Sequence, residues 1–323
     1  MNNHNVIGID LAKTVFQVAA FEKNKIVFNK QYKRQPLKEF IANHAPSTIA
    51  MEACYSSHYW AREFQQHGHQ VKLIPAQHVK PFTRGNKTDA NDAIAIIEAS
   101  LRPNLRLVPI KSTHQQDIQN LHRIRERLVG NRTALTNQTR GLLSEYGIVS
   151  PRGKKGFLLA IEQAMNNIAL SGLFKHELEA AITELQSTSI RISEIEATLQ
   201  RYLNDSEDCR ILNSMPGIGV INATALVSKY GNASQFKNAR GLPVSIGLTP
   251  KTNSSGDRRI MQGISKRGDP YLRKQLIHGA RSLLMFCDKR KDDALCQWAS
   301  RLKKRRGQNV AVVAVANRLA RLA

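Results

Sequence analysis

Over the first hundred residues, short apolar runs alternate with stretches of helical periodicity. Two of these runs, 6–10 and 48–52, end on an acidic residue. The first three runs are close enough to pair as hairpins, and the later ones alternate with helices, which is typical of an α/β sheet domain. We expect strands at 6–10, 15–21, 26–28, 48–52 and 71–75, and helices at 36–44 and 57–67.

Two later segments, 113–145 and 172–205, carry an apolar residue at every seventh position. The repeating residues are Leu121, Leu128, Leu135 and Leu142 in the first segment, and Leu178, Leu185, Ile192 and Leu199 in the second. A seven-residue repeat of this length predicts two long helices packed as a coiled-coil arm. Glycine and proline residues between 147 and 156 mark the bend that joins them. The pattern leaves open whether the arm pairs within one chain or between chains.

The chain is strongly basic, with 48 Lys and Arg against 25 Asp and Glu and a formal net charge of +23. Residues 251–323 alone hold 18 basic and 5 acidic residues, a net charge of +13, interleaved with apolar positions. Such a surplus attracts a polyanion, either nucleic acid or an anionic membrane. No apolar run reaches the roughly 18 residues of a membrane span, and the first residues lack the apolar core of a signal peptide. We therefore expect nucleic acid as the partner, no membrane, and a cytoplasmic location.

The four cysteines, Cys54, Cys209, Cys287 and Cys296, form no CxxC pair and lie far apart in the sequence. This spacing excludes the usual cysteine zinc sites and a disulfide framework. We expect reduced thiols, most of them in the core.

A glycine-rich turn separates two helical patterns near residue 217. Residues 212–219 lead into a helical run at 221–230, which has the form of a helix-hairpin-helix. Gly217 and Gly219 would let backbone amides approach a phosphate, and the N-terminus of the second helix favours an anion there. The same arrangement also serves purely as a packing unit, and both interpretations stay open.

Four acidic residues stand where apolar elements begin or end. Asp10 and Glu52 end runs that we expect to be neighbouring strands, whereas Asp89 and Asp92 enter the helical run at 94–100 on one face. Four converging carboxylates can hold two divalent metal ions that activate an attacking oxygen and stabilise a leaving one at a phosphodiester. Hard oxygen ligands suit Mg²⁺ or Mn²⁺. Taken singly, each acid also fits a turn, and Asp89 fits a helix N-cap.

These residues resemble the motifs of the DEDD transposases, which include the Piv-type DNA invertases and the bridge-RNA-guided recombinases of bacterial insertion sequences. The first block of the likeness is GIDLAK at 8–13, MEA at 51–53 and KTDANDA at 87–93. The second block is PGIG at 216–219, GLTP at 247–250, SG at 255–256, KRG at 266–268 and YLR at 271–273. The likeness covers nearly the whole chain with its parts in order.

The resemblance implies a mixed α/β and α architecture in three parts. These are an RNase H-like (RuvC-like) catalytic domain at 1–110, a coiled-coil domain at 111–207, and a mostly helical transposase domain with the helix-hairpin-helix at 208–323. The family's last helix runs further than the apolar helical pattern at 310–323, so the resemblance implies a helix longer than the one contained here.

By the same resemblance, Ser255 takes the place of the family's nucleophilic serine, with Ser254 as the neighbouring alternative. From the residues alone, 252–257 fits equally well as a loop tip of solvated turn residues. A serine hydroxyl needs help to attack phosphorus, which a nearby metal site can supply. The basic side chains that we expect to hold the phosphate and bind nucleic acid are Arg258, Arg259, Lys266, Arg267 and Arg273.

The function expected from this resemblance is that of a transposase which breaks a DNA strand through a phosphoserine link and joins it to another strand. The family implies a homo-oligomer, a dimer or tetramer, and a structured guide RNA that selects the DNA, in the bacterial cytoplasm at the nucleoid. Two alternatives remain from the residues. One is a Holliday-junction-resolvase-like metal nuclease that activates water at the four acids, and the other is a non-catalytic nucleic-acid scaffold.

Overall fold

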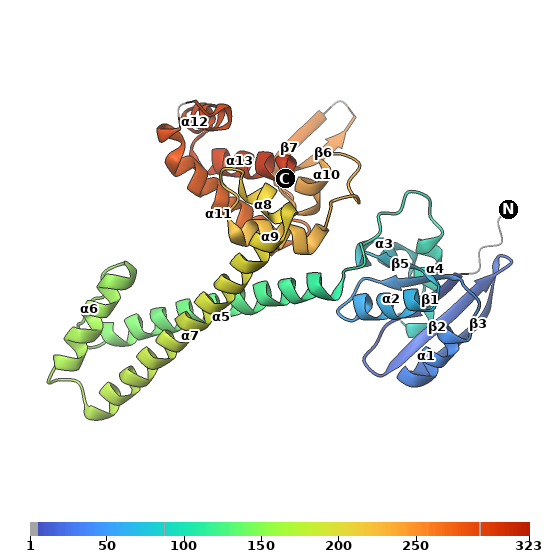
Figure 1. The fold of residues 1–323 in the computed structure, drawn as a ribbon, viewed down its shortest axis with the longest axis horizontal. Helices are drawn as coiled ribbons and strands as arrows, with labels where there is room; N and C mark the ends of the chain where they lie inside the picture. Colours follow the sequence, from blue (N-terminus) through green and yellow to red (C-terminus); the bar gives the residue numbers. More distant parts are fainter. Residues whose placement is uncertain (1–5, 87, 257, 291) are drawn as a thin grey trace. The chain divides into compact units, whose positions relative to one another are not determined.

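The computed structural model describes residues 6–86, 88–256, 258–290 and 292–323. The chain divides into two compact units, one ending at His114 and the other running Gln115–Ala323 (Figure 1). The expected first boundary at residue 110 lies four residues before the end of the first unit. The expected boundary between 207 and 208 falls inside the second unit, so the three-part division stays a prediction. Lys87 of the KTDANDA motif and Asp257, two positions after Ser255 in the sequence, lie outside the described residues.

The N-terminal unit is built on a five-stranded mixed sheet in the order β3-β2-β1-β4-β5. Its strands are β1 (Val6–Asp10), β2 (Val15–Glu22), β3 (Lys25–Lys33), β4 (Thr48–Glu52) and β5 (Gln70–Ile74). The first three strands form antiparallel hairpins, and β1, β4 and β5 are parallel. Parallel neighbours need a crossover, which helices α1 (Arg34–Ala42) and α2 (Ser57–Gln66) supply. The expected strands and helices of this unit are confirmed.

Helices cover both faces of the sheet. Leu37 of α1 and Trp60 of α2 pack with Ile7 and Ile9 of β1 on one face. Helix α4 (Asp89–Ser100) packs on the other face, where Ile97 lies in one cluster with Val6. Because side chains alternate along a strand, β1 contributes side chains to the cores on both faces of the sheet. Asp10 is the last residue of β1 and lies at the carboxyl end of this central strand. Short helices α3 (Ala76–Val79) and η1 (Lys80–Phe82) follow β5.

The C-terminal unit is mostly helical. Its helices are α5 (Thr113–Ser144), α6 (Gly153–Asn166), α7 (Gly172–Asp205), α8 (Glu207–Asn213), α9 (Val220–Tyr230), α10 (Gly241–Ser245), α11 (Pro270–Phe286), η2 (Cys287–Lys289), α12 (Ala294–Arg306) and α13 (Gln308–Leu322). One hydrophobic core runs from Leu203 to Ala320 and joins α9, α11 and α13. Cys209, Cys287 and Cys296 are buried in it as free thiols, as expected, and Cys54 is half-buried.

The long helices α5 and α7 share two hydrophobic clusters at the two ends of the arm, with no single core along its length. One cluster joins the end of α5 with α6 and the start of α7. The other joins the start of α5 with the end of α7 and packs against α9. The heptad fails near the end of α5, where Leu142 is 44% exposed while Leu143 is buried. An α-helix turns every 3.6 residues, so a strict seven-residue repeat drifts off the buried face. A continuous coiled-coil seam therefore stays a prediction.

A two-stranded hairpin projects from the helical unit and was missed in the sequence. Strand β6 (Pro250–Ser255) pairs antiparallel with β7 (Arg258–Ile264). All six residues of β6 are exposed, so the strand lacks the alternation of apolar and polar residues that marks a half-buried strand. The interpretation of 252–257 as a loop tip is wrong for the residues up to Ser255.

A buried polar contact ties α5 to α9 and α11. The ring of His122 is 3% exposed and lies 2.9 Å from the Tyr271 hydroxyl and 3.0 Å from Thr224 Oγ1. Thr224 already donates its proton to the Val220 carbonyl, so Nε2 of His122 donates to Thr224 and Nδ1 accepts from Tyr271. Burial, with a smaller contribution from the charge of Arg125, lowers the pKa of His122 to about 4.

Acidification from pH 7 to 4 is expected to lower the unfolding free energy of the C-terminal unit by about 3 kcal/mol through His122 alone. The folded pKa lies below the ordinary value of 6.5, so the contribution is full above pH 6.5 and is lost as the pH falls toward 4. The measurement is amide hydrogen exchange in α9 and α11, compared between the parent chain and His122→Gln, which cannot titrate. If the unfolding free energies of the two proteins differ by the same amount at pH 7 and at pH 4, His122 does not contribute in this way.

Candidate active site

Two carboxylates lie at one edge of the sheet because their strands are parallel neighbours. β1 pairs with β4 with Ile9 opposite Met51, so Asp10 and Glu52 are the next residues in register. Both are half-buried. The expectation that two acid-terminated runs are adjacent strands is confirmed.

Helix α4 brings two more carboxylates in its first turn, Asp89 and Asp92. Thr88 is the N-cap, and its hydroxyl accepts from the Asn91 amide at 3.3 Å. Asp89 is therefore not the cap, which removes its simplest structural explanation. Both acids stand at the positive end of the helix, where negative charge is favoured.

Gly8 sets how closely α4 approaches the sheet. A Cβ built on Gly8 would lie 2.5 Å from Ile97 Cγ1 and 2.6 Å from the Ala93 carbonyl oxygen. Any larger residue would push the helix off β1. The glycine of the GIDLAK motif thus allows the contact that carries the first turn of α4 toward Asp10.

The four acids interact electrostatically. The pKa of Asp10 is raised to about 6, mainly by burial and then by the charges of Asp92, Asp89 and Glu52, against a hydrogen bond from the Leu11 amide. A cluster of like charges of this kind stabilises any cation that enters it.

Two polar residues that the sequence analysis did not identify hold α4 against the sheet. Gln17 of β2 is 6% exposed, and its amide donates to Asn29 Oδ1 at 2.5 Å. Asn29 of β3 in turn donates to the Ala90 carbonyl at 3.0 Å, in the turn that carries Asp89 and Asp92. The available signal was Gln17 itself, a polar residue within an apolar run, because a buried amide requires a partner.

The donor chemistry of the acids fits a divalent cation, since all four offer hard carboxylate oxygens. Among residues 6–86, 88–256, 258–290 and 292–323, however, no three Asp, Glu, His or Cys side chains converge closely enough to hold a metal ion. The negative charges of the four acids thus favour binding of a cation. In the described part of the chain, however, their side chains do not meet at one coordination point.

Ser255 is the last residue of β6, at the tip of the hairpin. It pairs with Arg258 across the strands, whereas Ser254 pairs with Arg259. Cross-strand partners share a face and successive residues alternate, so Ser255 and Arg258 lie on one face and Ser254 on the other. Gly256, with φ of +54°, makes the turn. Ser255 and Arg258 are exposed, and the side chain of Arg259 lies outside the described part of the structure.

The other predicted basic residues lie at the base of this hairpin. Lys266 and Arg267 are exposed. Arg273 on α11 is different, because its Nη1 donates to the Ile246 carbonyl at 2.9 Å and to the Arg267 carbonyl at 3.2 Å. One nitrogen of this guanidinium is therefore engaged within the protein.

Two family models and several curated proteins match this chain. A model described as "Transposase IS116/IS110/IS902 family" matches residues 209–297, and the DEDD transposase model of IS110, described as "Transposase", matches residues 7–148. A "Probable family 20 transposase" of Pseudomonas aeruginosa is 42% identical, with 99% of this chain and 96% of the relative covered. The "Transposase for insertion sequence element IS1111A" of Coxiella burnetii is 40% identical over 98% of this chain and 88% of the relative.

The chain belongs to the IS110 family of DEDD insertion-sequence transposases. Membership implies DNA as the partner, and cleavage and rejoining of DNA as the activity. The two family models divide as the candidate site does, since all four acids lie in the match at 7–148 and Ser255 lies in the match at 209–297. In the described part of the transposase, no helix has the length and apolarity to span a bilayer.

The predicted phosphate-binding glycines of the transposase have different surroundings. Gly217, with φ of +89°, packs against α11 and α13, and a Cβ there would lie 3.1 Å from the Gly279 carbonyl oxygen. Gly219 is the N-cap of α9, and a Cβ built on it would meet no other atom within 4 Å among the described residues. A cavity of about 780 Å³ opens beside it, between this turn, α7 and α11. Gly217 therefore has a packing role, whereas Gly219 leaves the N-terminus of α9 accessible.

Proposed function

We propose that this transposase cleaves DNA with Ser255 as the nucleophile and rejoins the strand from a phosphoserine intermediate. The observation that carries the proposal is the position of Ser255, exposed at the tip of a projecting hairpin with Arg258 on the same face. A hairpin tip can reach a phosphodiester in duplex DNA, which a serine in a closed pocket cannot. The guanidinium of Arg258 would neutralise the charge that builds on the attacked phosphate.

The proposed chemistry exchanges one phosphoester for another. Ser255 Oγ forms a bond to phosphorus while the bond from phosphorus to the leaving sugar oxygen breaks; the serine proton passes to solvent and the leaving oxygen takes up a proton. A sugar hydroxyl of a second strand then attacks the phosphoserine and releases Ser255. The number of phosphoester bonds is constant, so strand exchange needs no further reactant.

We further propose that Asp10, Glu52, Asp89 and Asp92 hold Mg²⁺ or Mn²⁺ when the transposase is assembled on DNA. A divalent ion there would lower the pKa of the attacking hydroxyl and stabilise the leaving oxygen. The raised pKa of Asp10 and the carboxylate donors support this site. Among the described residues these acids do not converge on one point, so binding requires their side chains to draw together around the ion.

The experiment that tests the nucleophile is covalent trapping. The transposase is incubated with DNA carrying its insertion-sequence end and Mg²⁺, then denatured, and the DNA-linked peptide is sequenced by mass spectrometry. An adduct on the peptide containing Ser255 supports the proposal. The acidic cluster by itself also suits activation of water, as in a Holliday-junction-resolvase-like nuclease, and that function predicts nicked DNA without an adduct.

The fold supports three finer assignments. The mixed sheet, with a carboxylate at the ends of two parallel strands, supports an RNase H-like (RuvC-like) N-terminal domain. The two clusters shared by α5 and α7 support a coiled-coil domain, and the α8–turn–α9 unit with its open N-terminus supports a helix-hairpin-helix that binds a phosphate. By family resemblance, the active form is a dimer or tetramer that acts with a structured guide RNA at the nucleoid.

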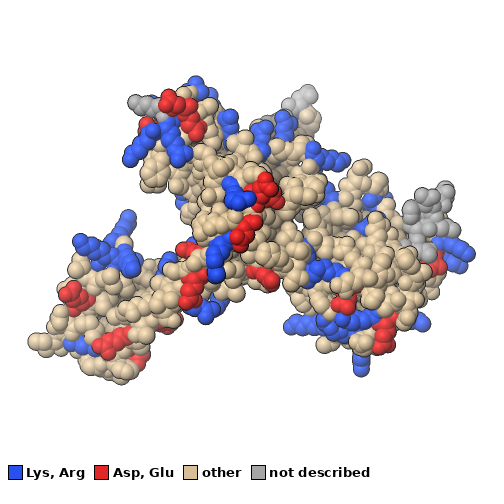
Figure 2. Space-filling view, in the orientation of Figure 1, with Lys and Arg blue, Asp and Glu red and all other residues tan. Residues whose placement is uncertain are grey.

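Helix α12 is the strongest candidate for a phosphate-binding surface. Its last turn carries the four exposed residues Lys303, Lys304, Arg305 and Arg306. Lys and Arg side chains gather over this part of the C-terminal unit, with a smaller acidic group beside them (Figure 2). The phosphodiester backbone of a nucleic acid binds such a surface with release of its counterions.

Replacing these four residues by alanine is expected to weaken nucleic-acid binding and to lower the slope of log affinity against log salt by about 3 to 4, because each lost phosphate contact removes about 0.9. The measurement is DNA affinity across a salt series. The matched control replaces Lys23, Lys25, Lys30 and Lys33, four exposed residues of the N-terminal unit, and should leave the slope nearly unchanged. Equal slopes for the parent and the α12 variant would exclude this surface.

A further inference from the structure

The serine hairpin is joined to the C-terminal unit by two short segments that lie side by side. Residues 246–249 enter β6 and residues 265–268 leave β7. The Ser265 amide donates to the Thr249 carbonyl at 2.8 Å, and the Lys266 amide donates to the Gly247 carbonyl at 3.1 Å. These bonds extend the pairing of the hairpin down to its base.

Two glycines let these segments touch backbone to backbone. A Cβ on Gly247, whose φ is +69°, would lie 2.3 Å from the Arg267 carbonyl oxygen. A Cβ on Gly268, whose φ is +76°, would lie 1.8 Å from the Ser245 carbonyl oxygen. Only glycine satisfies both the backbone angle and the contact at each position, so the base of the hairpin has a single tight arrangement.

Arg273 bridges the two segments. Its Nη1 carries two protons, and the hydrogen bonds to the carbonyls of Ile246 and Arg267 use one on each side of the hairpin. Both acceptors are backbone atoms, so the bridge fixes the path of the main chain whatever side chains the segments carry.

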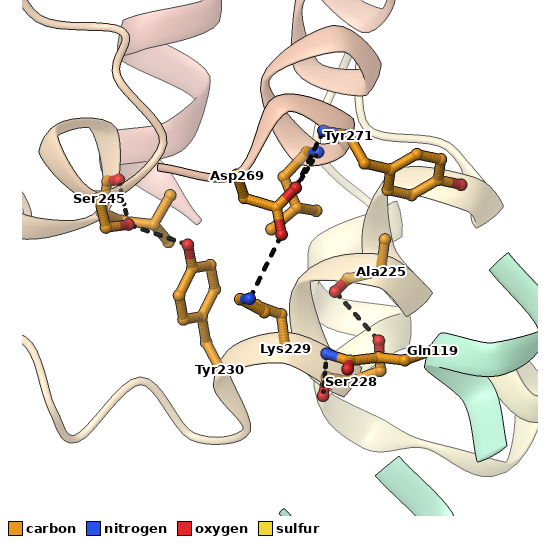
Figure 3. Close-up of polar contacts among 10 residues, drawn as sticks. Gln119, Ala225, Ser228, Lys229, Tyr230, Ser245, Asp269 and Tyr271 are labelled. Atoms are coloured by element: carbon orange, nitrogen blue, oxygen red, sulfur yellow. Dashed lines mark hydrogen bonds and ion pairs between the residues drawn. The ribbon is translucent and has the colours of Figure 1, made fainter. Parts of the chain in front are cut away.

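The helix that supplies Arg273 is itself fixed at its start. Asp269 caps α11 by accepting from the amides of Tyr271 and Leu272, and its other oxygen pairs with Lys229 of α9 at 3.4 Å. Tyr230 of α9 contacts the Ser245 hydroxyl at 2.9 Å (Figure 3). The base of the hairpin is therefore held from both α9 and α11.

We propose that Arg273 is a positioning residue for strand cleavage, which fixes the direction in which the hairpin presents Ser255. The inference rests on the proposed function, in which Ser255 is the nucleophile. At about 3.3 Å per residue, β6 places its tip roughly 17 Å from its base, so a tilt of ~10° at the base displaces Ser255 by about 3 Å. Nucleophilic attack tolerates much less than this, since a misplacement of about 1 Å can cost a hundredfold in rate.

Arg273→Ala is expected to slow cleavage of saturating DNA by about 10- to 100-fold in a single turnover, with the same fall in the rate of adduct formation. DNA affinity and its salt slope should change little, because the side chain acts on the protein and not on a phosphate. Amide exchange at Ser265 and Lys266 should accelerate at least tenfold. Arg273→Lys, whose ammonium can donate to both carbonyls, should recover most of the rate.

Arg281→Ala is the matched control, because it removes an exposed arginine from the same helix. It should keep both the cleavage rate and the exchange pattern. A fall in affinity and a salt slope lower by about 1 for Arg273→Ala, with a normal rate at saturation, would overturn the proposal and make Arg273 a phosphate ligand. Normal exchange at the hairpin base would also overturn it.

The outcome separates this inference from the proposed function. If Ser255→Ala still cleaves DNA, the nucleophile assignment fails. If Ser255→Ala is inactive while Arg273→Ala cleaves at the parent rate, the nucleophile stands and only the positioning role fails.

Discussion

Ser255→Ala is expected to abolish both the covalent protein–DNA adduct and strand exchange, by more than about a thousandfold, because no other atom replaces the lost nucleophile. Folding should be unaffected, since Ser255 is exposed at the end of β6 and a methyl group fits the same strand. DNA affinity should also remain. The measurements are adduct yield and recombination on the cognate DNA ends, with thermal unfolding as the check on folding.

Ser254→Ala is the matched control for this substitution. The two serines are adjacent, both exposed and of the same chemistry, but alternation along β6 directs them to opposite faces. Only one can share a face with Arg258 and meet the phosphate there. We expect Ser254→Ala to retain most of its activity.

The remaining outcomes are also decisive. If Ser254→Ala is the inactive variant, the serine mechanism stands and the assignment to Ser255 is wrong. If both variants still cut DNA and the parent forms no adduct, a nuclease that activates water replaces the recombinase.

Asp10→Asn is expected to lower the cleavage rate by about a thousandfold or more while DNA binding persists, because losing one metal ligand removes several kcal/mol of transition-state stabilisation. Asparagine has nearly the same shape and no charge. Since Asp10 is half-buried beside three other carboxylates, neutralising it relieves repulsion, and the unfolding temperature should stay the same or rise. The measurements are single-turnover cleavage in Mg²⁺ or Mn²⁺ and titration calorimetry of Mn²⁺ binding.

Glu39→Gln provides the control, as an exposed acid on α1 of the same unit. It should leave both Mn²⁺ binding and cleavage unchanged. Cleavage by Asp10→Asn at the parent rate would exclude the acidic cluster as the metal site. A loss of cleavage together with unchanged Mn²⁺ affinity would assign Asp10 a role other than ligand.

The sequence was sufficient to place the acidic cluster. An apolar run that ends on an acid identifies a strand end, so Asp10 and Glu52 were found from local pattern alone. Their adjacency followed from the alternation of strands and helices, because such a chain forms parallel neighbours whose ends meet at one edge. Asp89 and Asp92 followed from helical spacing. That Thr88 is the cap and Asp89 is not was fixed only by the structure.

The hairpin was not predictable from residue pattern. Strand β6 is exposed at all six residues, so no hydrophobic period marks it, and its polar residues are those of a loop. What makes it a strand is pairing with β7 and the closure of its base by Gly247, Gly268 and Arg273, which are contacts between distant positions. In the arm, the heptad repeat correctly predicted two long helices. It did not predict which residues are buried, because Leu142 of the repeat is exposed and its neighbour Leu143 is buried.

The sequence by itself therefore determined the strands and helices of the N-terminal unit, the two long helices of the arm and the excess of basic residues, since local periodicity and composition decide these. Only the tertiary structure decided which groups position others. Gly8 sets the approach of α4, Gln17 and Asn29 hold its first turn, Gly217 packs under α11, and Arg273 joins both sides of the hairpin base. The physical reason is that these roles are contacts with backbone atoms or distant side chains, and no short stretch of sequence encodes where those atoms come to lie.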